Sequence, residues 1–181
     1  MGKIVWNFFI SLDGVVESPD KWHFPYFNDE MGAAIDQGSA RLAGFLMGRK
    51  LHEEWAAYWP VQGDDMPFAP FINNTRKYVV SNSLREATWN NTTLISPGDV
   101  AARLREIKES GGDIGMCGSA TLVRWLLAND LLDELGRMIH PIAVGKGQRL
   151  FDDTPTYPLR LVRSEVFRTG VLNLTYAPGE C

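Results

Sequence analysis

The sequence predicts an α/β fold with a mostly parallel sheet that finishes in an antiparallel hairpin. Short apolar runs typical of strands alternate with segments of helical spacing over residues 4–140, and such alternation gives parallel strands joined by right-handed crossovers. The tail, residues 159–178, holds two strand-like runs on either side of Gly170, which predicts a hairpin. No repeat or linker divides the 181 residues, so we expect one domain over residues 1–181.

The first half of the chain alternates regularly. Strand-like runs lie at 4–10, 45–47, 77–80 and 92–95, and helical patterns lie at 29–42 and 51–58. Gly48 closes the second of these strands. Residues 59–74 contain three prolines among turn-forming residues, which predicts a long loop serving as a lid.

The second half begins with a helix over 96–110. Its apolar positions share one face: Val100, Ala101, Leu104 and Ile107. Ser96 with Asp99 resembles a capping box, and Gly111 and Gly112 end the helix. A short strand follows at 113–117. Ser119 is expected to cap the next helix, which ends near Asn129, and residues 132–140 form a strand before Pro141.

The composition of the chain narrows the range of possible functions. The net charge of -4, with no run of Lys and Arg, argues against nucleic-acid binding. No segment reads as a membrane span or signal peptide, and Cys117 and Cys181 form neither a disulfide framework nor a C-x-x-C pair. We therefore expect a cytoplasmic protein. The histidines and cysteines lack metal-ligand spacing, so no metal site is predicted.

Three junctions between a strand and the next segment could hold an anion. They are Gly48-Arg49-Lys50, Ser81-Asn82 and the glycine-rich stretch 111–123. Ligands of open α/β sheets bind beyond the carboxyl ends of strands, and a helix N-terminus favours negative charge. Each junction alone is more often a packing joint or a solvated helix start. Neither G-x-G-x-x-G nor a P-loop occurs, and Cys117 is either a nucleophile or, more commonly, a small buried thiol.

Several motifs, taken together in this order, resemble the dihydrofolate-reductase-like superfamily. They are SLDG (11–14), LMGRK (46–50), KYVVSNSL (77–84), CGSATLVRWLLANDLLDEL (117–135) and HPIAVGKGQRLF (140–151). The resemblance is strongest to the branch that contains the C-terminal reductase domain of the bifunctional riboflavin-biosynthesis enzyme. It covers nearly the whole chain and implies a three-layer α/β/α fold and an NADPH-dependent reductase.

The resemblance also implies where the cofactor binds. Gly48, Arg49 and Lys50 would meet its phosphates, and Ser81 and Asn82 would lie by the adenosine 2′-phosphate. The pyrophosphate would rest on a helix start formed by Gly118, Ser119, Ala120 and Thr121, and the backbone of 11–15 would border the nicotinamide. Leu51 departs from the Thr that dihydrofolate reductases usually have there, so one phosphate contact is lost.

The substrate side departs further from dihydrofolate reductases. Trp22-His23-Phe24-Pro25 matches their Trp-x-x-Pro segment, but Phe27 stands where they carry a carboxylate. Asp29 and Glu30 are the candidate catalytic acids, with Asp13 and water as rivals; near a helix start they serve equally as capping groups. The candidate substrate-binding residues are Asp13, Trp22, His23 and Phe27, although such aromatic residues also form cores.

The resulting hypothesis is an NADPH-dependent reductase that delivers hydride to a C=N or C=O bond of a small pterin- or pyrimidine-like heterocycle. One alternative is 5-amino-6-(5-phosphoribosylamino)uracil reductase, for whose phosphate the first loop offers only Lys21 and His23 as cations. Another is a non-catalytic module that binds NADPH or a pterin. The resemblance also suggests a homodimer; besides a second copy, only a small-molecule partner is expected.

Overall fold

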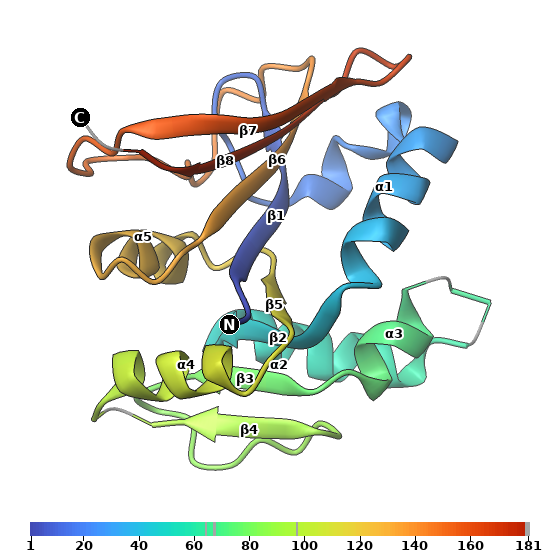
Figure 1. Cartoon of the computed structure of the whole chain (residues 1–181). Helices are drawn as coiled ribbons and strands as arrows, with labels where there is room; N and C mark the ends of the chain where they lie inside the picture. The colour runs from blue at the N-terminus through green and yellow to red at the C-terminus, as the bar shows by residue number, and fades with distance from the viewer. Residues whose placement is uncertain (64, 67, 97, 180–181) are drawn as a thin grey trace.

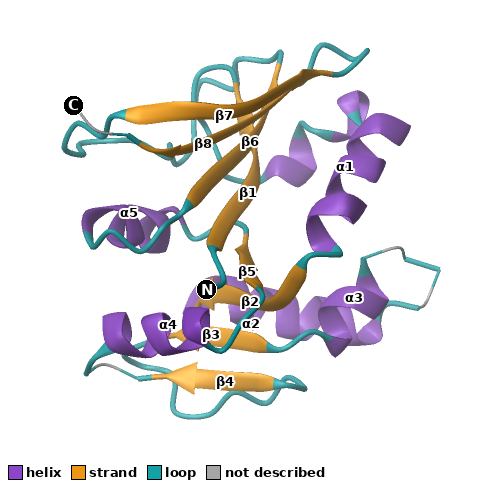
Figure 2. Cartoon of the chain, viewed as in Figure 1, coloured by secondary structure: helices purple, strands orange, loops and turns teal. Residues whose placement is uncertain are grey.

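The computed structural model describes residues 1–63, 65–66, 68–96 and 98–179, and over these ranges it contains one eight-stranded sheet (Figures 1 and 2). The strand order is β4-β3-β2-β5-β1-β6-β8-β7. The strands are β1 (Ile4–Ser11), β2 (Leu42–Gly48), β3 (Lys77–Val80), β4 (Thr92–Ile95), β5 (Asp113–Met116), β6 (Glu134–His140), β7 (Leu159–Val166) and β8 (Leu172–Pro178).

The pairing of the strands confirms the predicted fold class. All neighbours from β4 across to β6 pair in parallel, whereas β8 pairs antiparallel with both β6 and β7. The turn of the C-terminal hairpin is closed by the Gly170 amide, which donates to the Phe167 carbonyl, and Gly170 has a φ of 84°. Glycine adopts this left-handed conformation without steric cost, as the sequence led us to expect.

Helices cover both faces of the sheet, so the molecule has three layers. The α-helices are α1 (Asp29–Ser39), α2 (Arg49–Tyr58), α3 (Ala69–Asn74), α4 (Val100–Glu109) and α5 (Ala120–Ala128), and short 3₁₀ turns lie at Pro19–Lys21, Phe24–Tyr26 and Trp59–Val61. Figure 1 shows α5 and α1 on opposite sides of β1 and β6. None of the helices in the described ranges has the length and apolarity that crossing a membrane requires.

The core follows the two-residue period of the strands. Ile4, Trp6 and Ile10 of β1 face α4 and α5 and belong to the largest apolar cluster, which also buries Leu104 and Leu126. The opposite face carries two smaller, separate clusters. One joins β2 and β3 to α2 and α3, and the other joins β1 and β6 to α1 and the hairpin.

Helix ends differ from the sequence prediction at two places. α4 begins after Asp99, whose carboxylate accepts from the Ala102 amide at 2.9 Å, so Asp99 is the N-cap rather than the fourth residue of a capping box headed by Ser96. α1 begins after Asn28, which caps it through the Met31 amide, and ends at Ser39; Leu42 therefore opens β2 instead of closing the helix. Leu42 instead pairs in register with Asp113 of β5, and its side chain packs over Gly115.

The predicted long loop at 59–74 is wrong over much of its length. Trp59 starts a 3₁₀ turn and residues 69–74 form α3, which packs against α2 through Trp59 and Phe68; residues 64 and 67 lie outside the described ranges. Burial of these aromatic side chains outweighs the turn-forming composition. Because α3 leads into the first residue of β3, it lies at the amino edge of the sheet and cannot cover the carboxyl edge.

Candidate functional site

The carboxyl ends of the parallel strands gather the predicted anion-binding junctions along one edge. In strand order, Ser81 follows β3, Gly48 ends β2, Cys117 follows β5, and Ser11 ends β1 beside His140 of β6. The structure thus brings Ser81-Asn82, Gly48-Arg49-Lys50 and 118–121 into one row, which the sequence alone could only suggest.

The centre of this row is a contact between two helix starts. The Gly48 amide donates to Ser119 Oγ at 3.1 Å, which joins the beginning of α2 to the beginning of α5. Ser119 has a left-handed φ of 51° and makes no capping hydrogen bond to α5, so the expectation that it caps this helix is wrong. Within the described residues, neither α2 nor α5 has a side-chain N-cap, and their first amides are left for an outside acceptor.

The turn before α5 is anchored by a hydrogen bond from a buried tryptophan side chain. Trp6 Nε1 donates to the Gly118 carbonyl at 3.1 Å, and Trp6 itself is fully buried. Gly118 has a φ of 62°, and the Leu51 methyl groups would lie about 3.5 Å from a Cβ there. This left-handed backbone conformation favours glycine, and the Leu51 side chain packs against the turn.

The basic residues of the row occupy the first turn of α2. Arg49 forms an ion pair with Glu53 at 2.8 Å, one helical turn on, and both side chains are about half exposed. Lys50 is exposed and has no carboxylate partner among the described residues. Cations at a helix N-terminus oppose the helix dipole, so an anion bound there would relieve an unfavourable arrangement.

Ser81 and Asn82 differ in their availability. Ser81 is buried, and its Oγ accepts from the Ser83 and Leu84 amides at 3.2 and 2.9 Å, which shapes the turn after β3. Its hydroxyl hydrogen can still be donated. Asn82 is exposed. Cys117 lies between these junctions and is partly buried; burial of its thiol raises the pKa, which disfavours the reactive thiolate and so argues against a nucleophile.

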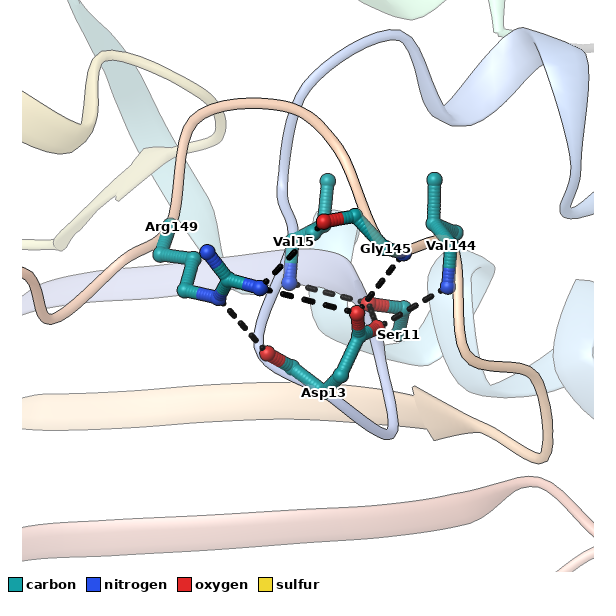
Figure 3. Close-up of polar contacts among 6 residues, drawn as sticks. All are labelled: Ser11, Asp13, Val15, Val144, Gly145 and Arg149. Atoms are coloured by element: carbon teal, nitrogen blue, oxygen red, sulfur yellow. Dashed lines mark hydrogen bonds and ion pairs between the residues drawn. The ribbon is translucent and has the colours of Figure 1, made fainter.

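Asp13 joins the loop after β1 to the loop after β6 (Figure 3). Its carboxylate accepts from the Ser11 hydroxyl at 2.6 Å and from the Val144 and Gly145 amides at 3.0 and 2.8 Å. The Ser11 hydroxyl and then the two amides lower the pKa of Asp13 to about 2. Arg149 donates to the Asp13 carbonyl at 3.1 Å. Because its carboxylate accepts these three hydrogen bonds, Asp13 acts as a structural clamp between the two loops.

Comparison with known proteins assigns the family. A model described as the RibD C-terminal domain matches residues 2–173. The chain belongs to the RibD C-terminal domain family. The resemblance found in the sequence motifs is thereby confirmed.

Two relatives of this RibD C-terminal domain chain match it over nearly their whole length. It is 25% identical over 180 residues to the uncharacterised protein YyaP of Bacillus subtilis strain 168, covering 96% of this chain and 94% of that one. A putative riboflavin biosynthesis protein from Shewanella sp. PV-4 superposes with a TM-score of 0.80 at 20% identity, over 99% and 100% of the two chains.

Two further solved structures show the same fold at lower identity. A diaminohydroxyphosphoribosylaminopyrimidine deaminase/5-amino-6-(5-phosphoribosylamino)uracil reductase from Thermotoga maritima gives a TM-score of 0.69 at 15% identity, over 98% of this chain and 57% of that one. A pyrimidine reductase-like protein from Corynebacterium diphtheriae gives 0.65 at 11% identity, over 99% and 93%.

The candidate acids of this RibD C-terminal domain chain lie at the start of α1. Glu30 accepts from the Arg168 amide and from Asn28 Nδ2, both at 2.8 Å, and these contacts, the Arg168 amide first, lower its pKa. Glu30 therefore fastens the hairpin turn to α1. Asp29 is exposed and makes no side-chain hydrogen bond within the described residues.

The aromatic residues predicted to bind substrate differ in their exposure to solvent. Trp22 and His23 are buried; His23 stacks on Phe9 with ring centroids 4.4 Å apart. Burial, and next the neighbouring His140, lower the pKa of His23 to about 4, so it is neutral near pH 7. Phe27 is half exposed at the start of α1. Only Phe27 of these three offers an open surface to a ligand.

Two residues of this region were not singled out from the sequence. His140 is fully buried at the end of β6, with Nδ1 2.8 Å from the Met138 carbonyl and Nε2 without a partner among the described residues. Asn7 is exposed although it lies on β1, an interior strand. The sequence signal for Asn7 was that it is a single polar residue within the apolar run 4–10.

Two surface hollows, of about 510 and 650 Å³, lie beside Trp89 at the amino edge of the sheet, opposite the candidate site.

Proposed function

We propose that the chain is an NADPH-dependent reductase that transfers hydride to a C=N or C=O bond of a small pterin- or pyrimidine-like heterocycle. One structural observation carries the proposal: the uncapped starts of α2 and α5 meet at the carboxyl edge through the Gly48–Ser119 hydrogen bond. Family membership supports a reductase, and the names of the T. maritima and C. diphtheriae proteins point to pyrimidine-type substrates.

The residues of this edge fit a dinucleotide phosphate. Free amides at two helix starts match a pyrophosphate, and glycine at positions 48 and 118 leaves the backbone accessible. Gly118, Ser119, Ala120 and Thr121 would bind the pyrophosphate at the start of α5. Gly48, Arg49 and Lys50 would face the same phosphates, and Ser81 with Asn82 would lie by the 2′-phosphate.

The chain's own contribution is to orient the reactants and supply a proton. When bound, NADPH supplies a hydride to the substrate carbon, while the substrate nitrogen or oxygen takes up a proton. The clamp at Asp13 fixes the loop that would border the nicotinamide. Asp13 and Glu30 are engaged in structural contacts, so we assign the proton to Asp29 or to water. Phe27 would stack on the substrate ring.

Reduction of 5-amino-6-(5-phosphoribosylamino)uracil is the second candidate, because the T. maritima neighbour carries that activity in its name. Its substrate bears a phosphate that needs cations. His23, one of the two cations considered for this role, is buried and neutral, which leaves Lys21 in the first loop. The structure therefore supports an unphosphorylated heterocycle as substrate better than it supports a phosphorylated one.

We further propose that the protein forms a homodimer and is located in the cytoplasm.

Cofactor binding and turnover test the proposal separately. Tryptophan quenching should show saturable NADPH binding with a Kd below about 1 mM. Gly48→Val, whose side chain would fill the meeting point of the helices, and Arg49→Ala should each weaken binding roughly tenfold, equivalent to about 1.4 kcal/mol. Gly38→Ala, in the open on α1, is the matched control and should bind normally.

Turnover is then measured as NADPH oxidation across pterins, quinones and ribosylamino-uracils. Oxidation with an unphosphorylated ring is the expected result. Saturable binding without turnover on any of these compounds would favour a non-catalytic binding module, and equal NADPH affinity in wild type and both variants would remove the cofactor site from this edge.

A further inference from the structure

Asn7 occupies an unusual position for an exposed side chain. β1 lies inside the sheet, between β5 and β6, where side chains are normally covered by a helix. On the face that carries α1, α2 and α3, however, the apolar cluster around α1 and the cluster around α2 and α3 are separate. Asn7 is exposed, whereas Val5 on the same face is buried. This part of the sheet face is open to solvent.

The orientation of the Asn7 carboxamide is set by Gly136. The two residues are register partners on β1 and β6, and a Cβ on Gly136 would overlap Asn7 Oδ1. The amide group therefore lies across Gly136, in the space that any other residue would fill. No described residue hydrogen-bonds this side chain, so the acceptor and both donors of the carboxamide have no partner among the described residues.

Asn7 also lies beside the proposed cofactor edge. The last register pair between β1 and β5 is Trp6 with Met116, so β5 ends one residue before the level of Asn7. Beyond that point the chain turns through Gly118, which Trp6 holds by its indole nitrogen, into the uncapped start of α5. On the far side, Phe9 shares the face with Asn7 and is half buried. A flat ring lying on the sheet here would have an amide directly beneath it.

We propose that Asn7 selects the ring bound on this face by pairing with a planar amide edge, an N–H beside a C=O. A carboxamide presents the complementary acceptor and donor and forms two parallel hydrogen bonds with such an edge. The inference rests on the proposed function, since it assumes that a ring binds next to the start of α5. Two sources carry this chemistry: the lactam edge of a pyrimidine- or pterin-like substrate, and the carboxamide of the nicotinamide.

Calorimetric titrations can show whether Asn7 pairs with the substrate lactam or with the nicotinamide carboxamide. Each titration compares two probes, one with an intact amide edge and one without it. The lactam pair is 5,6-diaminouracil and its 1,3-dimethyl derivative, in which both ring N–H groups are blocked. The nicotinamide pair is NADP⁺ and its 3-acetylpyridine analogue, in which a methyl group replaces the amide nitrogen. In at least one pair, wild-type protein should prefer the intact amide by about tenfold, the loss expected when a paired polar edge is broken.

Four variants assign that preference to Asn7. Asn7→Leu should abolish it, and Asn7→Asp, which cannot donate, should reduce it. Gly136→Ala should also reduce it, because the new methyl group displaces the amide without altering it. Asn173→Leu is the matched control: it removes the same group from the same sheet face on β8, where Asn173 pairs in register with Met138, and should retain the full preference.

The outcomes separate this inference from the proposed function. Equal affinities within both probe pairs in wild type, or a preference that survives in Asn7→Leu, overturn the role of Asn7. Should Asn7→Leu fail to fold, Asn7→Asp and Gly136→Ala decide by the same criterion. If NADP⁺ does not bind but the protein still shows a lactam preference that depends on Asn7, the proposed function is refuted. The amide-binding role of Asn7 is then retained.

Discussion

Asp13 shows how a single carboxylate can organise two distant segments. Residues 11–15 and 142–149 are far apart in the sequence, yet they are joined by the Asp13 side chain, by the Arg149 contact to its carbonyl, and by an isolated bridge between Val15 and Arg149. Three donors on one carboxylate favour its charged form. The loop that would border a nicotinamide is thus fixed by a residue that looks catalytic in the sequence.

We predict that Asp13→Asn loosens this junction. An amide offers one acceptor oxygen and no charge, so it cannot serve Val144 and Gly145 as the carboxylate does. Hydrogen exchange should accelerate at these two amides and the thermal midpoint should fall by a few degrees, whereas Asp36→Asn on the exposed side of α1 should change neither. Because the folded pKa is below the usual value, this stabilisation is present above about pH 4 and lost as the pH falls toward about 2.

At the scale of elements, the short helix α3 depends on a buried lysine. Lys77, the first residue of β3, is fully buried, and its Nζ donates to the Ile72 and Thr75 carbonyls, each at 2.8 Å. The ammonium group also lies 4.4 Å from the centroid of the Trp89 ring. Burial lowers the pKa of Lys77 to about 8. The lysine satisfies carbonyls at the end of α3 that the helix itself cannot pair.

We predict that Lys77→Met destabilises the protein by about 2–3 kcal/mol, because buried carbonyl groups lose their donor. The substitution keeps a long apolar stem and so isolates the polar loss. Lys146→Met, in an exposed loop, should stay within about 0.5 kcal/mol of wild type. Urea unfolding measures both. Similar values for the two variants would show that the carbonyls of α3 find other donors.

At the scale of the whole molecule, buried histidines link stability to pH. His23 and His140 have ring centroids 6.1 Å apart, and Phe9, Trp22, Phe24 and Tyr26 surround them. Burial is the main cause that lowers both pKa values, although the charge of Asp20 raises that of His23 slightly. The folded protein therefore holds both rings neutral where the unfolded chain would be protonated.

We predict that the free energy of unfolding falls as the pH is lowered from about 6.5 to about 4. The unfolded state binds protons in this window and the folded state does not, and the shift of His23 to about 4 corresponds to roughly 3 kcal/mol. His23→Phe keeps a ring against Phe9 and should flatten this slope in urea titrations at pH 7 and pH 4.5. An unchanged slope would assign the acid sensitivity to other groups.

Much of this architecture could be predicted from the sequence. Strands at 77–80 and 92–95, the glycine stop after α4 and the C-terminal hairpin follow from local preferences, because apolar period, glycine and turn residues act over a few positions. The family motifs likewise lie in short segments, which is why the resemblance was visible before any contact was known.

Tertiary structure decided what individual side chains do. Ser119 looked like a cap, but its hydroxyl accepts from Gly48, 71 positions away. Glu30 looked like an acid and fastens a turn 138 positions away, and the openness of the sheet face above Asn7 depends on where α1 and α2 pack. Local sequence determines the elements because their preferences are short-range. The partner of a polar side chain depends on which elements pack together, and that is settled only when the whole sheet is formed.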